Sequence, residues 1–454
     1  MSDSISSRRR FLRSVGGVCV GGLLASRVWA DGRPAVTNPR ATDGDDRYEP
    51  NWDEKFQITV GHPQEAGHSK ADLVGNSDKV LQAALDSVAR MGGGTVKVLP
   101  GKYILRNAVH LPSKVRLLGS GDDSILTKIP SETVGLSDDS DWYDQEISLK
   151  KSLGFQVGDG IALRAKNPSH GGQIVIKRTL IARSGNRFKL SDGLRENLWL
   201  TGKPTCSSLF PLLTSERTSD VLIEDITLDG NGKNNENFNG NYGGGIFLQD
   251  CNRYTFRNVT SRNYNGDGIS FQICHDVVVE NCHSHDNNDL GVHPGSGSQR
   301  PLIRNNRLDN NSQGIFWCWG VKYGLAENNS IHENRRFGIS IGHCDTDNII
   351  RNNTITNSGE IGVLFRDDPR GQDFWANRNL LEGNRIENSG GDAGVAIDVT
   401  GKTKAVRIVG NTLRETRQKM NRSGIRIGAQ VGEIVLKENS FEGFASELVD
   451  QRSV

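Results

Sequence analysis

The sequence has no surplus of charge of either sign, no C-x-x-C pair and no long apolar run. Its 55 Lys and Arg residues balance 54 Asp and Glu residues, and without a basic surplus nucleic acid is not an expected partner. The lack of C-x-x-C pairs argues against a zinc site. The apolar run at residues 15–25 is too short and too glycine-rich to span a membrane. We therefore expect no nucleic-acid partner, no zinc site and no membrane span.

The first 30 residues have the pattern of a targeting segment. Residues 7–13, Ser-Arg-Arg-Arg-Phe-Leu-Arg, match the twin-arginine pattern, and a small-residue cleavage site follows at residues 28–30. Residues 31–55 are polar and are predicted to be a linker. We expect export by the twin-arginine pathway, with the mature protein periplasmic or secreted.

Glycine is abundant, with 53 residues, and it opens a short phrase that returns along the chain. The phrase, a glycine followed by alternating apolar residues, begins at positions 245, 268, 291, 314, 338 and 362, with wider-spaced copies at 394 and 424. Apolar residues at period two are typical of strands and not of helices. A unit of about two dozen residues cannot bury a face alone and must stack on its neighbours. The prediction is an all-β chain, a right-handed parallel β-helix with three strands in each coil.

Two further residue types keep step with this repeat. Asparagine recurs near the strand positions, and its side chain can both donate to and accept from its copies in the next coils, so we expect an internal ladder. The ladder is predicted from Asn258, Asn281, Asn306, Asn329, Asn353, Asn384, Asn411 and Asn439. Cys251 and Cys274 follow their glycines at the same offset. We expect them to stack as buried free thiols rather than to form a disulfide.

The remaining segments predict how the β-helix begins and where it is interrupted. Residues 79–88 have helical spacing and run through a glycine turn into a strand, which predicts a helix that caps the first coil within residues 56–130. The repeat fades over residues 131–212, where residues 155–163 and 172–176 look like antiparallel strands of a small inserted β subdomain. The main β-helix is expected at residues 213–454.

The chain resembles the pectate-lyase-like β-helix superfamily over most of residues 70–450. The resemblance rests on the helix-capped start, which ends in a strand and a Pro-Gly-x-Tyr turn at residues 100–103, and on the coils that follow. It implies a polysaccharide as the partner. We expect a monomer.

A β-helix converts offsets within the phrase into columns across the coils. Residues one and three after the glycine are expected to point inward, and those two and four after it to point outward. The offsets predict that Trp319, His343 and Asp367 form one cluster, with Gly295 and Gly342 opening a groove beside it. Trp317 is assigned to the core.

Candidate catalytic residues lie in these columns and just before the glycines. Asp267 and Asp289 precede successive glycines close to His293, and two carboxylates near a histidine could supply an acid and a base for sugar chemistry. Aspartate is also common in turns, and for each one alone that structural role is the simpler interpretation. His343 and Asp367 complete the predicted catalytic set.

Four further residues are predicted to bind substrate. Arg366 could hold a sugar carboxylate or sulfate through two hydrogen bonds. Trp319 offers an aromatic face for a sugar ring, and Asp345 and Gln272 are polar neighbours in the same coils. No metal ligand set is predicted, although Ca²⁺ is retained as a cofactor that could neutralise a uronate.

Two motifs resemble those of characterised families. Residues 265–269, Asn-Gly-Asp-Gly-Ile, are similar to the first acidic motif of polygalacturonase-type hydrolases, with Asn288-Asp289 one coil later and Leu290 in place of a second aspartate. Residues 291–294 are similar in register to the Asp-Pro-His phrase of alginate epimerases, with His293 in place of the aspartate.

Three functions stay open. A glycoside hydrolase needs two carboxylates facing one groove. A polysaccharide lyase or epimerase needs a base, His293 or His343, and a group that neutralises the uronate, Arg366 or Ca²⁺. A non-catalytic glycan-binding surface protein needs neither. The clustered His, Asp and Arg favour an enzyme, and we prefer the hydrolase at this stage.

Overall fold

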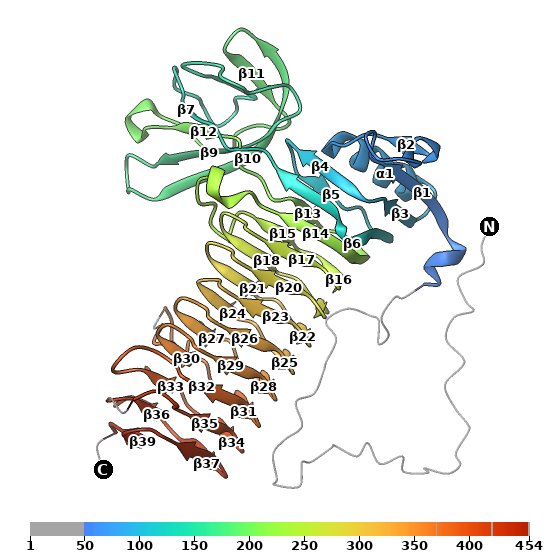
Figure 1. Cartoon of the computed structure of the whole chain (residues 1–454). Helices are drawn as coiled ribbons and strands as arrows, with labels where there is room; N and C mark the ends of the chain where they lie inside the picture. The colour runs from blue at the N-terminus through green and yellow to red at the C-terminus, as the bar shows by residue number, and fades with distance from the viewer. Residues whose placement is uncertain (1–49, 369, 419–420, 453–454) are drawn as a thin grey trace, which may run out of the picture. The chain divides into compact units, whose positions relative to one another are not determined.

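The computed structural model describes residues 50–368, 370–418 and 421–452, and parallel strands dominate them (Figure 1). The predicted targeting segment and the first part of the predicted linker lie outside these residues. At the end of that linker, Trp52 of the short 3-10 helix η1 (Trp52–Glu54) is buried. No helix among the described residues is long and apolar enough to cross a membrane.

One side of the solenoid is an 11-stranded parallel sheet, to which each successive coil adds one strand. Its strands are β5 (Val109–His110), β13 (Leu213–Glu216), β15 (Gly244–Gln249), β18 (Asp267–Gln272), β21 (Leu290–Ser296), β24 (Gln313–Trp319), β27 (Phe337–Ile341), β30 (Ile361–Phe365), β33 (Val395–Val399), β36 (Ser423–Ile427) and β39 (Ser446–Asp450). We call its solvent-side surface the outer face. It carries the predicted site.

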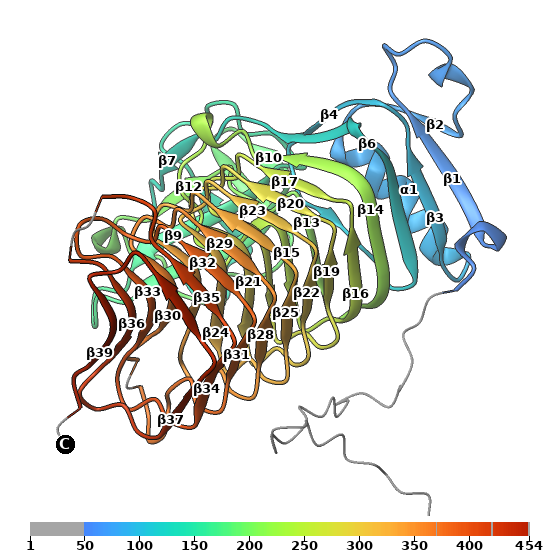
Figure 2. The same ribbon diagram turned by 60° about the horizontal axis from the view of Figure 1, so that its bottom comes forward.

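The other strands of the coils form a 22-stranded sheet, in which the main coils contribute two short strands each (Figure 2). The first coils supply β1 (Phe56–Gly61), β2 (Leu73–Val74), β3 (Gly94–Val98), β4 (Gly101–Leu105), β6 (Val115–Lys128) and β14 (Ser219–Asp229). The later coils supply β16 (Asn252–Arg257), β17 (Thr260–Arg262), β19 (Val278–Glu280), β20 (His283–His285), β22 (Leu302–Arg304), β23 (Arg307–Asp309), β25 (Leu325–Glu327), β26 (Ser330–His332), β28 (Ile349–Arg351), β29 (Thr354–Thr356), β31 (Leu380–Glu382), β32 (Arg385–Glu387), β34 (Val406–Val409), β35 (Thr412–Arg414), β37 (Ile434–Lys437) and β38 (Ser440–Glu442). The right-handed parallel β-helix of three-strand coils is therefore confirmed.

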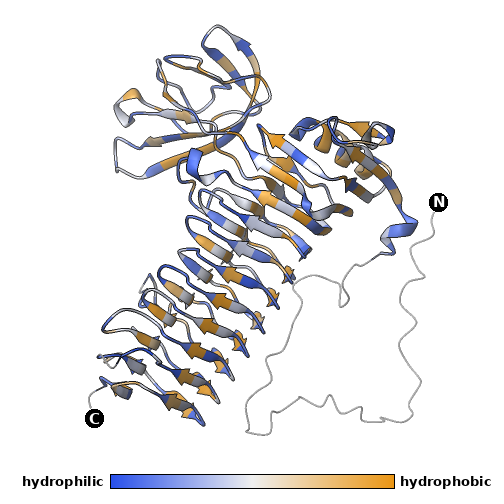
Figure 3. Cartoon of the chain, viewed as in Figure 1, coloured by the Kyte–Doolittle hydropathy of each residue, from blue (hydrophilic) through white to orange (hydrophobic). Residues whose placement is uncertain are grey.

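The core fills the interior of the coils. Strand registers pair Ile246 with Ile269 and Leu248 with Phe271, so offsets one and three point inward as predicted, and Trp317 is fully buried in this core. Figure 3 shows hydrophobic and hydrophilic residues alternating along the stacked strands. Each buried aliphatic side chain contributes about 1.5–3 kcal/mol relative to exposure. The coils are held together by this burial.

Helix α1 (Asp78–Arg90) covers the first coil, as predicted. It buries Leu81, Ala84, Leu85 and Val88, one face at helical spacing, in the core against β1 and β3. This apolar face closes the end of the stack, where unpaired strand edges would otherwise invite association.

The inserted segment forms a separate antiparallel sheet with its own apolar core. Its strands are β7 (Thr133–Gly135), β8 (Glu146–Ser148), β9 (Gly160–Lys166), β10 (Gln173–Ser184), β11 (Arg187–Leu190) and β12 (Thr205–Ser207). The predicted antiparallel pair is confirmed, because β9 pairs with β10 in that sense.

The asparagine ladder is confirmed in part. Asn306, Asn329 and Asn353 are buried, and each Oδ1 accepts from a backbone amide one coil back. The Oδ1 atoms of Asn329 and Asn353 also accept from the side-chain amide of the preceding asparagine. Asn258 and Asn281 were wrongly included, because they occupy the left-handed turn position one residue earlier in the coil. Asparagine tolerates that conformation well, so the same residue type serves two adjacent positions.

One register was also predicted wrongly. The same offset counted from Gly394 and from Gly362 predicts that Asp398 lies beside Arg366, whereas the strands pair Asp398 with Leu364 and with Arg426. In this wide coil the residue aligned with Gly362 is Ala396, so the glycine lies two residues early. The six cysteines of the described chain are free thiols, in agreement with the prediction.

Candidate active site

Polar and aromatic side chains form a row along the outer face from β18 to β30. Ser270 pairs with His293, and Phe316 pairs with Ser340, as the column prediction requires. Most of this row is nevertheless buried, because loops lie over it. Outward direction in a β-helix therefore does not imply contact with solvent.

Asp267 and His293 form a buried pair at the start of the row. The Nδ1 atom of His293 lies 2.7 Å from Oδ2 of Asp267, and Asp267 also accepts from the backbone amide of Leu290 at 3.2 Å. The Nε2 atom of His293 faces the carbonyl of Cys318 at 3.3 Å. Both ring nitrogens thus have acceptor neighbours within the protein.

The loop between β14 and β15 covers Asp267, whose side chain is 1% exposed. A Cβ added at Gly240 would lie 1.7 Å from Oδ2 of Asp267, and the hydroxyl of Ser270 donates to the Gly240 carbonyl. The expectation that Asp267 faces a groove is therefore wrong. The predicted proximity to His293 is confirmed.

Asp289 lies near this pair and is half-buried. Its Oδ2 accepts from the side chain of Asn237 at 2.9 Å. Burial raises the pKa of Asp289, Asn237 opposes the rise, and the charge of Asp267 adds to it. This carboxyl remains within reach of solvent.

Phe316 and Arg366 form the centre of the row. The Arg366 guanidinium lies 4.3 Å from the centroid of the Phe316 ring, and the ring of His293 packs against the same phenyl group edge-on at 5.2 Å. Arg366 donates to the hydroxyl of Ser340 at 2.5 Å and to the carbonyl of Trp317 at 2.8 Å. A cation is thus held over an aromatic ring that is itself only half-buried.

His343 lies one coil after Phe316, just past the end of β27, and is next to Trp319. The two rings stack at 5.9 Å, and Trp319 is 45% exposed. Nδ1 of His343 lies 3.0 Å from Sγ of Cys318. Nε2 is 3.1 Å from a carboxylate oxygen of Asp368, although the angle does not suit a hydrogen bond.

Burial and the neighbouring charges together determine the protonation of His343. Burial lowers the pKa of His343 below its ordinary value of 6.5, Asp368 opposes this, and Arg366 and Arg370 add to it. Burial also raises the pKa of Cys318 to about 12, so its sulfur stays a neutral thiol. The imidazole is therefore favoured in its neutral form.

The predicted cluster contains the wrong aspartate. Asp367 points away and accepts from Nε1 of Trp375 at 3.0 Å, whereas Asp368 joins His343 and also accepts from Nε of Arg366 at 3.0 Å. The turn after β30 decides which of the two adjacent carboxylates faces the site, and the strand alternation does not extend into it. No signal in the sequence distinguished them.

Two predicted substrate-binding residues are engaged within the protein. Asp345 is fully buried and accepts from the backbone amides of Val321 and Gly342. Burial raises its pKa to about 7, against the effect of Arg366. Gln272 is buried and donates to Ser270. Asp345 therefore stabilises a turn and does not face substrate.

Sequence reasoning missed four residues of the site as well as Asp368. Phe316, Cys318 and Ser340 lie in the predicted columns, so their positions could be read, but their chemistry was not singled out. The loop between β30 and β31 adds Arg370, whose guanidinium lies 5.7 Å from the Trp319 ring. Loop residues carry no column position and could not be placed.

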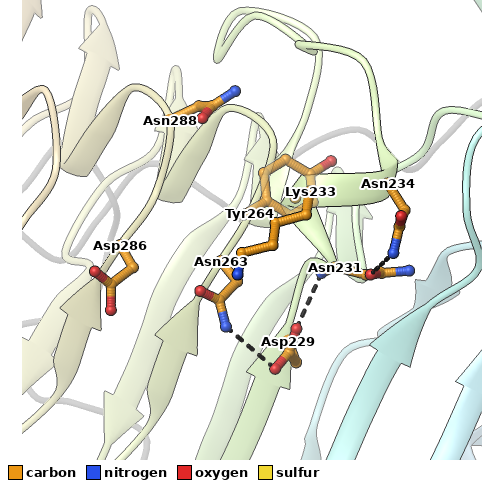
Figure 4. A pocket seen from close by; sticks show the side chains of 9 residues that line it. Asp229, Asn231, Lys233, Asn234, Asn263, Tyr264, Asp286 and Asn288 are labelled. Carbon is orange, nitrogen blue, oxygen red and sulfur yellow. Dashed lines mark hydrogen bonds between the residues drawn. The ribbon is translucent and has the colours of Figure 1, made fainter.

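A cleft of about 660 Å³ lies at a corner of the coils beside this row (Figure 4). Its lining includes Asp229, Asn263 and Asn288, and Asp229 accepts from the amide of Asn263 and from the backbone of Asn231. These residues occupy successive turns, where Asp and Asn are common for structural reasons. Sequence reasoning did not identify this cleft.

The fit of a metal ion can be judged from the ligands present. Within the described ranges no group of three or more His, Cys, Asp or Glu side chains is arranged to hold one. The Ca²⁺ considered from the sequence stays a prediction.

Comparisons with known proteins address the fold. Residues 218–369 and 322–451 match the sequence profile described as the right-handed beta helix region. The A-module of mannuronan C-5 epimerase AlgE4 from Azotobacter vinelandii superposes with a TM-score of 0.52 and 16% identity, covering 83% of this chain and 96% of that one. The surface adhesin PfbA of Streptococcus pneumoniae gives 0.51 and 13% identity, covering 81% and 88%. No curated protein matches the sequence.

Identities this low show a shared fold and nothing about activity. The profile matches, in contrast, together span residues 218–451, which is more than half of the chain. They agree with the observed coils and with the resemblance predicted from the sequence. The protein belongs to the right-handed β-helix family.

Proposed function

We propose that the protein is an exported carbohydrate-active enzyme that acts on a uronate-containing polysaccharide by removing the proton next to the sugar carboxylate. This is the first step of both a lyase and an epimerase. The observation that carries the proposal is Arg366, a guanidinium held over the Phe316 ring on the outer face, one coil from His343. A uronate carboxylate that pairs with this cation makes the neighbouring C5 proton more acidic.

His343 is the base in this proposal. A ring that donates from Nδ1 to the sulfur of Cys318 carries its basic lone pair on Nε2, which is buried and has no hydrogen-bond partner, and the lowered pKa keeps it unprotonated near neutral pH. Asp368 beside Nε2 stabilises the imidazolium that forms. Trp319, which is 45% exposed, offers aromatic surface to a sugar ring of the bound chain.

The C5–H electron pair moves toward the carboxylate as His343 takes the proton, and Arg366 stabilises the charge that develops. In a lyase this electron pair then forms the C4–C5 double bond, the C4–O bond breaks, the leaving oxygen takes a proton from water, and the His343 imidazolium loses its proton to solvent. In an epimerase a proton returns to C5 from the opposite face. Neither outcome requires a redox partner.

The hydrolase preferred from sequence is less well supported. Its two carboxylates were Asp267 and Asp289, and Asp267 is buried beneath the β14–β15 loop and paired with His293. One carboxylate with access to solvent, Asp289, does not complete a general acid and base pair. A non-catalytic glycan-binding protein would not need a histidine enclosed by a carboxylate and two guanidinium groups.

The proposal is tested with the mature protein and a panel of uronate polysaccharides that includes polygalacturonate, alginate and hyaluronan. New absorbance near ~235 nm, the general mark of an unsaturated uronate, identifies a lyase, and a changed uronate configuration without it identifies an epimerase. The matched pair of variants is Arg366→Gln and Arg385→Gln, the latter on β32 of the other sheet. We expect loss of activity only in the first. Reducing ends without new absorbance would instead establish a hydrolase.

A further inference from the structure

A second cleft lies where the inserted sheet meets the outer face. It has a volume of about 650 Å³, and β10 of the insert forms one wall while β13 and β15 of the coils form the other. Phe247 and Gln249 of β15 belong to the same outward columns as Ser270 and Gln272. The cleft is therefore on the same face as the proposed active site, toward the N-terminal end of the stack.

Lys177 on β10 is the cation that enters this cleft. Its ammonium lies 4.0 Å from the centroid of the Phe247 ring, and among the described residues no hydrogen bond or ion pair is recorded for its Nζ. Burial lowers the pKa of Lys177 to about 8, against the effect of Glu216. An ammonium this poorly solvated gains most from an anion that enters the cleft.

The lining holds four other charged side chains, Arg178, Arg195, Glu196 and Glu216. Arg195 and Glu196 are exposed, so water solvates their charges. Arg178 donates to backbone carbonyls of Gly193 and Leu194, which fixes the insert and leaves its guanidinium unavailable. Glu216 is exposed and pairs with Arg217 at 3.2 Å. Lys177 is thus the group of the lining best placed to receive a negative ligand.

We propose that this cleft is an accessory subsite in which Lys177, held over the buried ring of Phe247, binds the carboxylate of a sugar unit remote from the one that reacts. The proposal rests on the proposed function and names its substrate class, an acidic chain long enough to reach both places. From β15 to β24, the strand under Arg366, there are three strand spacings, or about 14 Å. A disaccharide bound at Arg366 would not reach Lys177.

The proposed subsite gives the inserted subdomain a role in substrate binding. It brings one lysine from outside the coil repeat against the outer face, which the repeat alone could not provide. An acidic chain held at both ends would be aligned along the stack before the reaction.

The test compares Lys177→Gln with Lys189→Gln, an exposed lysine on β11 of the same inserted sheet. Probes are the uronate of the panel that the wild-type chain accepts, as a long oligomer, as a disaccharide and as the carboxyl-reduced neutral oligomer. Calorimetry on the full chain gives Kd, and turnover gives KM and kcat. We expect Lys177→Gln to raise Kd and KM for the long oligomer about tenfold, with kcat, the disaccharide and the neutral oligomer unaffected.

Each other outcome overturns the subsite in a distinct way. Wild-type affinity of Lys177→Gln for the long oligomer would remove it while leaving the proposed function intact. An equal loss on the disaccharide, or on the neutral oligomer, would show that Lys177 acts at the reacting unit or without recognising charge. Failure of the wild-type chain to bind or convert any uronate would overturn the proposed function and the subsite together.

Discussion

The imidazole of His293 lies 2.7 Å from the carboxylate of Asp267, although 26 residues separate the two in the chain. One coil of the β-helix brings them together, and the loop between β14 and β15 encloses them. The pair packs against Phe316 and reaches the carbonyl of Cys318, so it supports the site from below. In the proposed function it is a positioning element that does not contact substrate.

Removing this carboxylate should cost stability. Asp267→Ala removes the carboxylate that lies 2.7 Å from Nδ1 of the buried His293 and that accepts from the amide of Leu290, and we expect the free energy of unfolding to fall by about 3–5 kcal/mol. Asp267→Asn keeps an acceptor and should lose less. Denaturant unfolding measures both against Asp392→Ala, an exposed control. Wild-type stability of Asp267→Ala would mean that the pair is not formed.

Removing the proposed base should abolish turnover without unfolding the chain. His343→Gln keeps a polar side chain of similar length, and we expect kcat to fall by about 10²–10⁴-fold because proton transfer is lost. His332→Gln on β26, in the other sheet, is the matched control and should retain activity. Circular dichroism checks that both variants keep their strands. Full activity in His343→Gln would exclude it as the base.

The pH profile should reflect the depressed pKa of His343. The base acts when unprotonated, so kcat/KM should hold as pH falls through 6.5 and decline only below it, at the lowered pKa. The free energy of unfolding changes in the same direction. Between the lowered pKa of His343 in the folded chain and its ordinary value of 6.5 in the unfolded chain, the unfolded chain binds more protons. Stability is therefore lost as pH falls through that window. A decline that begins above pH 6.5 would contradict the assignment.

Lys128 offers a test of burial that is separate from catalysis. It is fully buried, its Nζ lies 3.4 Å from Oδ1 of Asn265, and desolvation lowers its pKa to about 7. Below that pH the poorly solvated ammonium lowers the free energy of unfolding. This destabilisation diminishes as pH rises toward 10.5, the pKa of an ordinary lysine. Lys128→Met should therefore raise Tm by about 2–4 °C near neutral pH.

The pH dependence separates this prediction from a simple packing effect. The gain in Tm of Lys128→Met over wild type should shrink at alkaline pH, because the lysine is then neutral in the folded state. Scanning calorimetry at several pH values measures the difference. A gain that is constant with pH, or a loss near neutral pH, would mean that the ammonium is better solvated than its burial indicates.

The sequence predicted what the stacking of coils determines. Ser270 pairs with His293 and Trp317 lies in the core because period-two alternation and a constant coil length fix direction and register. Where the coil lengthens, the register shifted, and Asp398 was misplaced by two positions.

The loops determine the rest of the site, and their positions do not follow from the repeat. The burial of Asp267 depends on where Gly240 lies, and the choice between Asp367 and Asp368 depends on one turn. Neither the cover over the outer face nor the position of Lys177 against Phe247 follows from a repeating phrase, because each comes from a segment outside it.

The most direct test of the proposed chemistry is proton NMR of a uronate polysaccharide incubated with the protein in D₂O. Abstraction at C5 predicts either loss of the H5 signal, as deuterium replaces it in an inverted sugar, or the vinyl proton of a C4–C5 double bond. Both changes should disappear in His343→Gln and in Arg366→Gln. A full H5 signal in every uronate of the panel, with or without cleavage of the chain, would contradict the account.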